Sequence, residues 1–412
     1  MNGTGRRQFL RTGGALCVVG LAGCVGQGDD DPEEYHLDAE LEDDHPDSGD
    51  DGWPTFHYDA HNSGHGPGPG PTETVERKWR TELGGNVYSS PAVVDDTVYV
   101  GSDDGLFALD AESGAQDWLF RTGNRIVSSP AVVDDTVYVG ANDHRLYAVS
   151  ATDGEERWRL ETDDLVPASP TVVDGTVYVG SNDHSLYAVD AETGDLEWRE
   201  STGGPLQRAP AVTEDTVYVG SSDQFLYAFD AETGRERWSF ETEGWIQSRP
   251  TVFEDTVYVG SNDDAVYALD AESGTDRWVF HTDGSVTGSP AVVDDIVFAP
   301  SHDGHVYAIS AVVGPATDDP DLEVARLWRT GHYQSIRSSP VLVGTTLYFG
   351  SEFGNVHAIS ARDGTDRWRY ATDDVVASSP AVVDGTVYVG SNDGSVYALE
   401  EGDGDTETDD DT

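Results

Sequence analysis

Four arginines stand close to a proline that recurs along the chain, and their side chains could bind an anion. Arg208, Arg249 and Arg337 lie one to three residues before such a proline, and Arg125 lies five residues before another. Two aromatic residues, Trp245 and Tyr333, occupy the same stretches. Guanidinium groups pair with carboxylates and phosphates and stack on rings. If the fold brings these residues together, they would attract an anionic or planar ligand; the alternative is that the arginines neutralise nearby aspartates and plug a channel.

A second set of polar residues recurs as Asn-Asp pairs, whose oxygen atoms could bind calcium at regular intervals. The pairs are Asn142-Asp143, Asn182-Asp183, Asn262-Asp263 and Asn392-Asp393. Each pair offers only one or two oxygens in a tight turn. Asn and Asp favour such turns because their side chains bond the local backbone. Turn chemistry is therefore the preferred interpretation, and no metal site is predicted.

The histidines show no pattern of zinc ligation or catalysis. His144 and His184 occupy the same position of adjacent repeats, while His302 and His305 lie together in another repeat. No Cys/His spacing typical of zinc, no Gly-Xaa-Ser-Xaa-Gly elbow and no phosphate-binding loop occurs in the sequence. We therefore predict turn positions on the surface for these histidines and no catalytic residue.

These candidates are positioned by a repeat of about 40 residues. The recurring prolines are Pro91, Pro130, Pro170, Pro210, Pro250, Pro290, Pro340 and Pro380. In one unit, strands are expected at 169–173, 176–180 and 186–189 and around Trp198, with Asp/Asn/Gly turns between them. Four short strands at this period are typical of a propeller blade, and the residues just before each proline should then lie at the mouth of the central channel.

One tryptophan per repeat indicates the number of blades. These residues are Trp118, Trp158, Trp198, Trp238, Trp278, Trp328 and Trp368. The eighth repeat ends near residue 400 without a tryptophan, and residues 75–80, which include Trp79, could supply its missing strand. Such pairing removes the open edge of a ring. The sequence thus predicts an all-β, eight-bladed β-propeller of four-stranded blades, closed by an N-terminal strand carrying Trp79.

The segment Ala191-Glu192-Thr193-Gly194 followed by Trp198 resembles the tryptophan-docking repeat of pyrroloquinoline quinone (PQQ)-type propellers. The resemblance covers residues 74–400 and implies that each tryptophan ring stacks between neighbouring blades. Residues 53–59, followed by Ser63-Gly64, also resemble the lead-in found ahead of such propellers. The sixth unit departs from the pattern, because Val312 to Ala325 replaces the usual loop with a longer insertion that we expect to protrude.

The resemblance implies two possible activities. Members of one branch are quinone-dependent dehydrogenases, in which PQQ lies against a vicinal disulfide and calcium is held by Glu, Asn and Asp. The other branch is non-catalytic and includes the lipid-anchored barrel-assembly propeller of bacteria. The chain has no cysteine after Cys24, so that disulfide cannot form. We expect a binding or scaffold module without a cofactor. A PQQ- and calcium-dependent oxidoreductase, or a carbohydrate-binding propeller, is the alternative.

The strongly negative net charge of the chain argues against nucleic acid as a partner. The chain has 412 residues and a formal charge of −55, and 20 basic against 58 acidic residues leave −38 on residues 53–400. A polyanion such as nucleic acid would be repelled. Lys78 is the only lysine, so the other 22 basic residues are arginine. This composition resembles that of secreted proteins from salt-loving archaea, since molar salt screens the self-repulsion of such a surface.

The first 24 residues resemble an export signal. Arg6-Arg7-Gln8-Phe9-Leu10 ahead of a short apolar stretch looks like a twin-arginine signal, and Leu21-Ala22-Gly23-Cys24 resembles a lipobox, with Cys24 as the lipidation site. The expected parts are a signal at 1–24, an acidic tether at 25–52, the lead-in at 53–73, the propeller at 74–400 and an acidic tail at 401–412. We expect a monomer anchored by lipid to the outer face of the cytoplasmic membrane, with an unidentified protein or small channel ligand as its partner.

Overall fold

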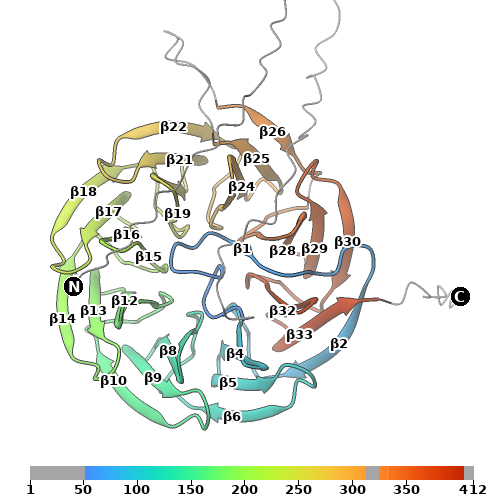
Figure 1. Cartoon of the computed structure of the whole chain (residues 1–412), viewed down its shortest axis with the longest axis horizontal. Coiled ribbons are helices and arrows are strands. Elements are labelled where there is room, and N and C mark those ends of the chain that lie inside the picture. The colour runs from blue at the N-terminus through green and yellow to red at the C-terminus, as the bar shows by residue number, and fades with distance from the viewer. Residues whose placement is uncertain (1–51, 312–323, 332, 403–412) are drawn as a thin grey trace, which may run out of the picture. The chain divides into compact units, whose positions relative to one another are not determined.

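The computed structural model describes residues 52–311, 324–331 and 333–402, in which the regular structure is β-strand throughout. Eight sheets follow one another around a central axis, as Figure 1 shows. They form an eight-bladed propeller of four-stranded blades, which confirms the expected fold class. In this part of the chain, no helix is long and apolar enough to cross a membrane.

The first four blades run from the innermost strand to the outermost in chain order. Their strands are β3 (Ala92–Val94), β4 (Thr97–Ser102), β5 (Gly105–Asp110) and β6 (Gln116–Phe120); β7 (Ala131–Val133), β8 (Thr136–Ala141), β9 (Arg145–Ser150) and β10 (Glu156–Glu161); β11 (Thr171–Val173), β12 (Thr176–Gly180), β13 (Ser185–Asp190) and β14 (Leu196–Ser201); β15 (Ala211–Val212), β16 (Thr216–Gly220), β17 (Phe225–Asp230) and β18 (Glu236–Glu241).

The next three blades repeat this order, and the eighth draws one strand from the start of the propeller. The strands are β19 (Thr251–Phe253), β20 (Thr256–Gly260), β21 (Ala265–Asp270) and β22 (Asp276–His281); β23 (Ala291–Val293), β24 (Ile296–Pro300), β25 (Val306–Ser310) and β26 (Arg326–Arg329); β27 (Val341–Val343), β28 (Thr346–Gly350), β29 (Asn355–Ser360) and β30 (Asp366–Ala371), joined by β1 (His65–Gly66); β31 (Ala381–Val383), β32 (Thr386–Gly390), β33 (Ser395–Glu401) and β2 (Val75–Glu82).

The second strand of each blade lies in the core. Every residue of β16 and of β20 is buried, because neighbouring blades cover both faces of the sheet. Alternating Val and Tyr suit such a position, since β-branched and aromatic side chains pack well on a pleated surface. Asp174 and Gly175 both have positive φ, 48° and 80°, which is the backbone of the tight turn that joins adjacent antiparallel strands.

The outer strand of each blade carries the tryptophan of the repeat, and its indole N–H donates a hydrogen bond to the following blade. In blade three, Trp198 Nε1 lies 2.9 Å from the carbonyl oxygen of Ala231. Equivalent bonds of 2.9–3.4 Å run from Trp79, Trp118, Trp158, Trp238, Trp278 and Trp328 to an alanine carbonyl. Trp368 instead donates to the carbonyl of Pro71 in the lead-in, at 2.7 Å.

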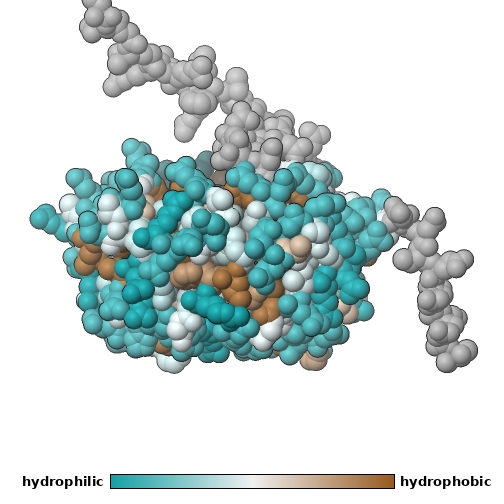
Figure 2. Space-filling model, turned by 90° about the horizontal axis from the view of Figure 1, so that it is seen from below, coloured by the Kyte–Doolittle hydropathy of each residue, from teal (hydrophilic) through white to brown (hydrophobic). Residues whose placement is uncertain are grey.

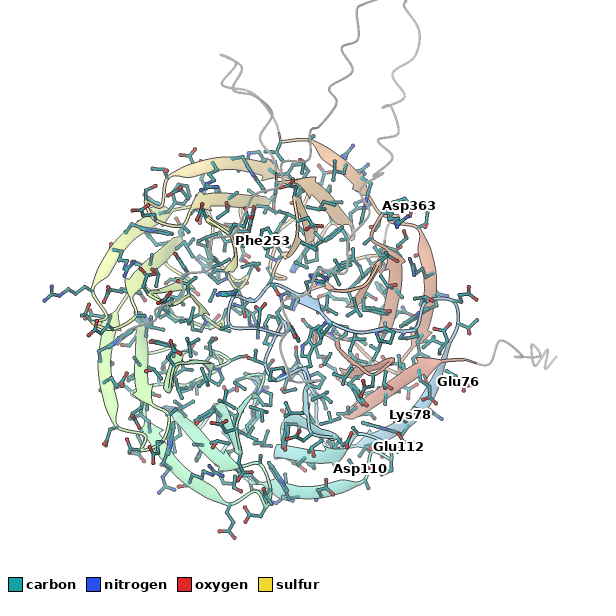
Figure 3. All side chains as sticks on the ribbon, in the orientation of Figure 1. Glu76, Lys78, Asp110, Glu112, Phe253 and Asp363 are labelled. Carbon is teal, nitrogen blue, oxygen red and sulfur yellow. The ribbon has the colours of Figure 1, made fainter. Side chains whose placement is uncertain are left out.

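The eighth blade joins the two ends of the propeller sequence. Strand β2 pairs antiparallel with β33, with Trp79 opposite Ala398. Trp79 then donates to Ala111 of blade one, and Lys78 forms an ion pair with Glu112 at the same junction, where Figure 3 shows the two side chains close together.

Several expected features lie outside the described residues. They are the signal and lipidation site at Cys24, the tether up to residue 51, most of the insertion expected between Val312 and Ala325, and the tail after residue 402.

Candidate functional site

A pocket of about 490 Å³ lies on the propeller axis, because residues from all eight blades and the lead-in line it. The lining residues are Phe56, Tyr88, Ser90, Arg125, Val127, Pro167, Gln207, Arg208, Gln247, Arg249, Thr287, Ser289, His302, Arg337, Ser339, Ala377 and Ser379. The pocket therefore brings together all four arginines singled out by their position before the prolines. None of its lining residues has a carboxylate.

The wall of the pocket includes serines that belong to a hydrogen-bonded ring. In six of the eight blades, the residue before the proline is serine, and the backbone N–H before each proline donates to the hydroxyl of the next blade where that serine is present. The bonds are Ser90 to Ser129 (3.0 Å), Ser129 to Ser169 (2.7 Å), Arg249 to Ser289 (3.0 Å), Ser289 to Ser339 (2.8 Å), Ser339 to Ser379 (3.0 Å) and Ser379 to Ser90 (2.8 Å). The recurring Ser-Pro dipeptide thus connects blade to blade.

The ring is interrupted in blades four and five, where alanine and arginine replace the serine. Ala209 has no hydroxyl to offer Ser169, and the side chain of Arg249 reaches back across blade four instead. Its Nη2 donates to Ser169 Oγ at 3.0 Å. The small side chain at position 209 is compatible with this path. Two substitutions in the repeat therefore place a guanidinium group inside the ring of serines.

Arg208 and Arg249 have few partners for their charge. Arg208 Nε donates to the carbonyl oxygen of Gln247 at 2.7 Å, and the guanidinium carbon of Arg249 lies 3.1 Å from the ring centroid of Phe56. Arg249 Nε is buried without a hydrogen-bond partner. Within the described residues, neither side chain lies within 4.0 Å of a carboxylate oxygen. The pocket thus contains positive charge that is not neutralised locally.

The electrostatics of the pocket follow from this arrangement. Burial, and then repulsion from Arg208, lower the pKa of Arg249 well below its usual range. Burial and repulsion from Arg337 likewise lower the pKa of Arg208, and burial followed by the charge of Arg337 lowers that of His302. Each shift has the sign expected of a cation that has lost water and lies near another cation. An anion in the pocket would favour the charged forms of these side chains and raise their pKa values again.

The two remaining arginines differ from this pair. Arg337 forms an ion pair with Glu352 at 2.6 Å, although more than half of its side-chain surface stays exposed. Arg125 is exposed, and its guanidinium lies 5.9 Å from the ring centroid of Tyr88. Both stand at the edge of the pocket, where they would meet an entering anion before the inner pair does.

The lead-in crosses the centre of the ring, as the blue trace in Figure 1 shows. Its backbone bonds to the innermost strand of six blades: Trp53 to Val93, Pro54 to Val132, Ala60 to Val212, His61 to Val252, Ser63 to Val292 and Gly64 to Leu342. Asn62 adds two side-chain bonds, to the carbonyls of Pro210 (3.3 Å) and Pro250 (3.0 Å). Phe56 is thereby fixed beneath Arg249 as part of the wall.

The two aromatic residues predicted to join the arginines lie elsewhere. Trp245 is 52% exposed and does not line the pocket, although it is only four residues before Arg249. Tyr333 packs its ring against Phe349 and His357 and donates its hydroxyl to Asp366, so it faces between strands of the next blade rather than the channel. Sequence distance from the proline did not reveal which way these side chains point.

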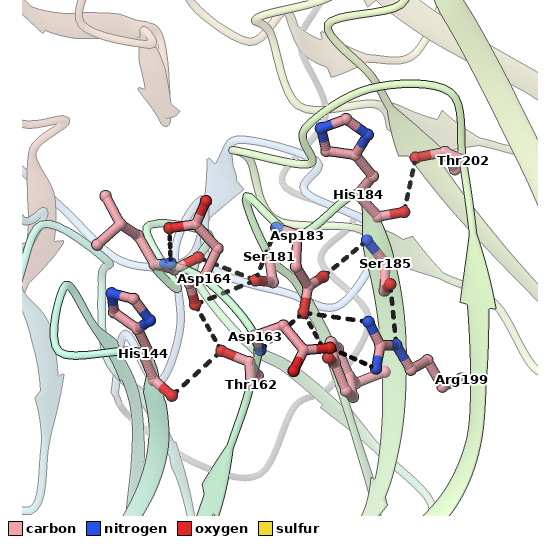
Figure 4. A network of polar contacts seen from close by, with 12 residues as sticks. His144, Thr162, Asp163, Asp164, Ser181, Asp183, His184, Ser185, Arg199 and Thr202 are labelled. Carbon is pink, nitrogen blue, oxygen red and sulfur yellow. Dashed lines mark hydrogen bonds and ion pairs between the residues drawn. The ribbon is translucent and has the colours of Figure 1, made fainter.

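The repeated Asn-Asp turns engage their aspartates in hydrogen bonds within the blades. In the turn of Figure 4, Asp183 Oδ2 accepts from the backbone N–H of Asp163 at 3.1 Å, from the hydroxyl of Tyr187 and from Arg199. His144 and His184 are exposed, and their carbonyl oxygens accept from Thr162 and Thr202. No cluster of three or more metal-ligating side chains exists in the part of the chain that the structure describes.

Comparison with known proteins identifies the family. The family described as outer membrane protein assembly factor BamB matches residues 72–205, 143–247, 243–317 and 322–407. This chain belongs to that family. Among curated proteins, none matches its sequence.

Solved structures share the fold of this BamB-family propeller. BamB from Moraxella catarrhalis superposes with a TM-score of 0.67 at 22% identity, over 79% of this chain and 98% of that one. A europium-containing methanol dehydrogenase gives 0.69 at 13% identity over 85% and 98%, and the quinohemoprotein alcohol dehydrogenase from Comamonas testosteroni gives 0.69 at 16% over 84% and 80%. At these identities the likeness shows the propeller fold alone.

The shared fold of the dehydrogenases raises the question of whether PQQ with calcium fits this pocket. Calcium prefers carboxylate and other oxygen ligands. The lining supplies four guanidinium groups, one imidazole, hydroxyls and amides, with no carboxylate to hold the metal or accept a proton from a substrate. These residues do not fit a calcium-bound quinone.

Some residues of the site could not be singled out from sequence. Phe56 and Tyr88 line the pocket, yet neither their type nor their spacing sets them apart. His302 was predicted to lie at a surface turn, but its partly buried side chain also lines the pocket. The serine ring did leave a signal, because Ser precedes the proline in six repeats and Ala209 and Arg249 break that rule. Only the hydrogen bonds between blades show the consequence of these two substitutions, which is that the side chain of Arg249 bonds Ser169 across blade four.

Proposed function

We propose that this chain is a non-catalytic binding or scaffold propeller outside the cytoplasm, which presents its channel mouth and loops to a small ligand or a protein partner. The observation that carries the proposal is the axial pocket with four arginines and no carboxylate. Carboxylates are the preferred protein ligands of calcium, and the lining supplies none. The match to a family of assembly factors supports the same interpretation.

The test is reconstitution with PQQ and calcium. Purified protein is incubated with both, and dye reduction is followed with alcohols and sugars as substrates. We expect no turnover above a heat-denatured control. Dye-linked turnover that requires both PQQ and calcium would overturn the proposal and establish a quinone-dependent oxidoreductase.

We further propose that the chain is anchored through lipid on Cys24 after export by the twin-arginine route. The paired arginines and the small residues before Cys24 support this. Cell fractionation of the full chain should place it in the membrane fraction, and Cys24→Ser should release it to the soluble fraction. A matched Cys17→Ser variant should remain membrane-bound. If the Cys24→Ser variant also stayed in the membrane fraction, the lipid anchor on Cys24 would be contradicted.

A further inference from the structure

We propose that the axial pocket binds a small polyanion carrying at least two carboxylate or phosphate groups, with Arg208 and Arg249 as its inner anchors. This inference rests on the proposed function and names the ligand of the same channel. The interrupted serine ring provides the first argument. Six blades place a neutral hydroxyl before the proline, whereas blade five places a cation there and blade four has the small Ala209 that is compatible with the path of that cation.

The second argument is the incomplete bonding of the inner arginines. Arg249 uses Nη2 on Ser169 and one ring face on Phe56, while its Nε is buried without a partner. Arg208 uses only Nε, on a neutral carbonyl. A buried guanidinium costs free energy unless a charged partner satisfies it. Within the described residues no acidic side chain does so, and the remaining N–H donors are free for an external anion.

The third argument is the contrast with the rest of the molecule. About half of the other arginines in the described residues pair with carboxylates; Arg199, for example, bonds Asp163 at 3.0 Å, and Arg237 bonds Asp215 at 3.0 Å and Asp230 at 2.8 Å. In a chain with 78 acidic residues, a pocket with no acidic lining is unlike its surroundings. The negative exterior slows the approach of any anion, so affinity must come from contacts inside the pocket.

The geometry points to a small ligand with more than one charge. A volume of about 490 Å³ accommodates a compact molecule rather than a polymer. The inner pair can engage one anionic group and the outer arginines, Arg125 and Arg337, a second. Guanidinium forks bind carboxylate and phosphate oxygens in the same bidentate manner. His302 and the serine hydroxyls add donors that suit either group.

Calorimetric titration at a low and at a high chloride concentration tests the inference with two probes. Citrate represents a polycarboxylate and pyrophosphate a phosphate, while triethyl citrate is the uncharged control. We expect at least one of the two anions to bind, triethyl citrate not to bind, and added chloride to weaken the binding. The anion that binds identifies the source of the ligand. Absence of binding by both anions would overturn the inference.

Variants show whether the binding depends on the pocket. Arg208→Met and Arg249→Met should each weaken binding at least tenfold, and Arg249→Lys should restore part of it. Arg235→Met removes an exposed arginine outside the pocket and should leave affinity unchanged. If Arg249→Met does not fold by circular dichroism, Arg208→Met and Arg125→Met carry the test. Equal affinity in the pocket variants and Arg235→Met would overturn the inference.

The two proposals fail separately. Dye-linked turnover with PQQ and calcium would overturn the non-catalytic function whether or not citrate binds. Lack of anion binding without turnover would overturn only the ligand class and leave a protein partner for the propeller.

Discussion

In the described residues, six of the eight docked tryptophans lie on a glycine of the next blade, so the contact depends on a residue with no side chain. Gly194 has φ +77°, and a Cβ atom there would lie 2.7 Å from Cδ2 of Trp158. The docking therefore requires glycine both for its backbone conformation and for its size. This links the Glu-Thr-Gly part of the repeat to the tryptophan of the preceding blade.

Replacing this glycine should destabilise the propeller more than the backbone conformation alone explains. Gly194→Ala should lower the free energy of unfolding by about 2–4 kcal/mol, combining left-handed strain with overpacking. Gly175→Ala is the matched control, because Gly175 has φ +80° and nothing within 4 Å of an added Cβ. Gly175→Ala should lower the free energy of unfolding by only ~1 kcal/mol. Denaturant unfolding measures both, and equal costs would refute the docking contact.

The buried histidine of the lead-in makes stability depend on pH. His57 is 1% exposed, and its Nδ1 lies 3.2 Å from the carbonyl oxygen of Asn62. Burial, followed by repulsion from Arg249, lowers the pKa of His57 to about 3. Below the ordinary value of 6.5 the unfolded chain gains a proton that the folded protein does not bind. Stability is therefore lost as the pH falls from 6.5 towards 3.

His57→Asn should reduce this pH dependence. Asparagine tolerates the positive φ of 54° at this position and keeps an N–H donor. The wild-type protein should lose about 2 kcal/mol more than the variant between pH 7 and pH 5. Urea unfolding at both pH values measures the difference, and parallel losses in the two proteins would contradict the assignment.

At the scale of elements, deletion of β2 tests whether this strand closes the propeller ring. It covers the edge of β33, and the junction with blade one depends on Trp79 and Lys78. Deleting residues 74–83 should leave an unpaired edge that promotes association. Analytical ultracentrifugation should show oligomers, while Trp79→Ala, which keeps the strand, should stay monomeric. A deletion variant that remains monomeric and equally stable would refute a closing role for β2.

The blades could be predicted from the sequence better than the pocket. Repeats of 40 residues with one tryptophan each set the number and order of strands, because blade packing depends mainly on local pattern. The arginines of the pocket were found because they break that pattern. The sequence did not show that Trp245 and Tyr333 lie outside the pocket, because the direction of a side chain depends on contacts with other blades. The path of the lead-in through the channel follows from hydrogen bonds to six blades, which no local pattern encodes.

At the scale of the whole molecule, charge should make stability depend on salt. The side of the molecule seen in Figure 2 is mostly hydrophilic, with apolar patches between. Residues 53–400 have a net charge of −38. The screening length is about 10 Å at 0.1 M salt and about 3 Å at 1 M, so repulsion between carboxylates weakens as salt increases.

Melting temperature should therefore rise from dilute to molar sodium chloride. Sucrose at matched osmolality is the control, because it strengthens burial without screening charge. A rise in salt much larger than in sucrose is expected. Equal melting temperatures in low and high salt would contradict adaptation of this surface to a saline environment.

The central claim is that the axial pocket of this propeller holds an anion rather than a catalytic centre. The most direct measurement is a crystal structure of the protein purified from its native host, with the electron density of the channel examined. We expect density for a small polyanion within hydrogen-bonding distance of the guanidinium groups of Arg208 and Arg249. A pocket filled only by water, or one that holds PQQ with calcium, would contradict the account.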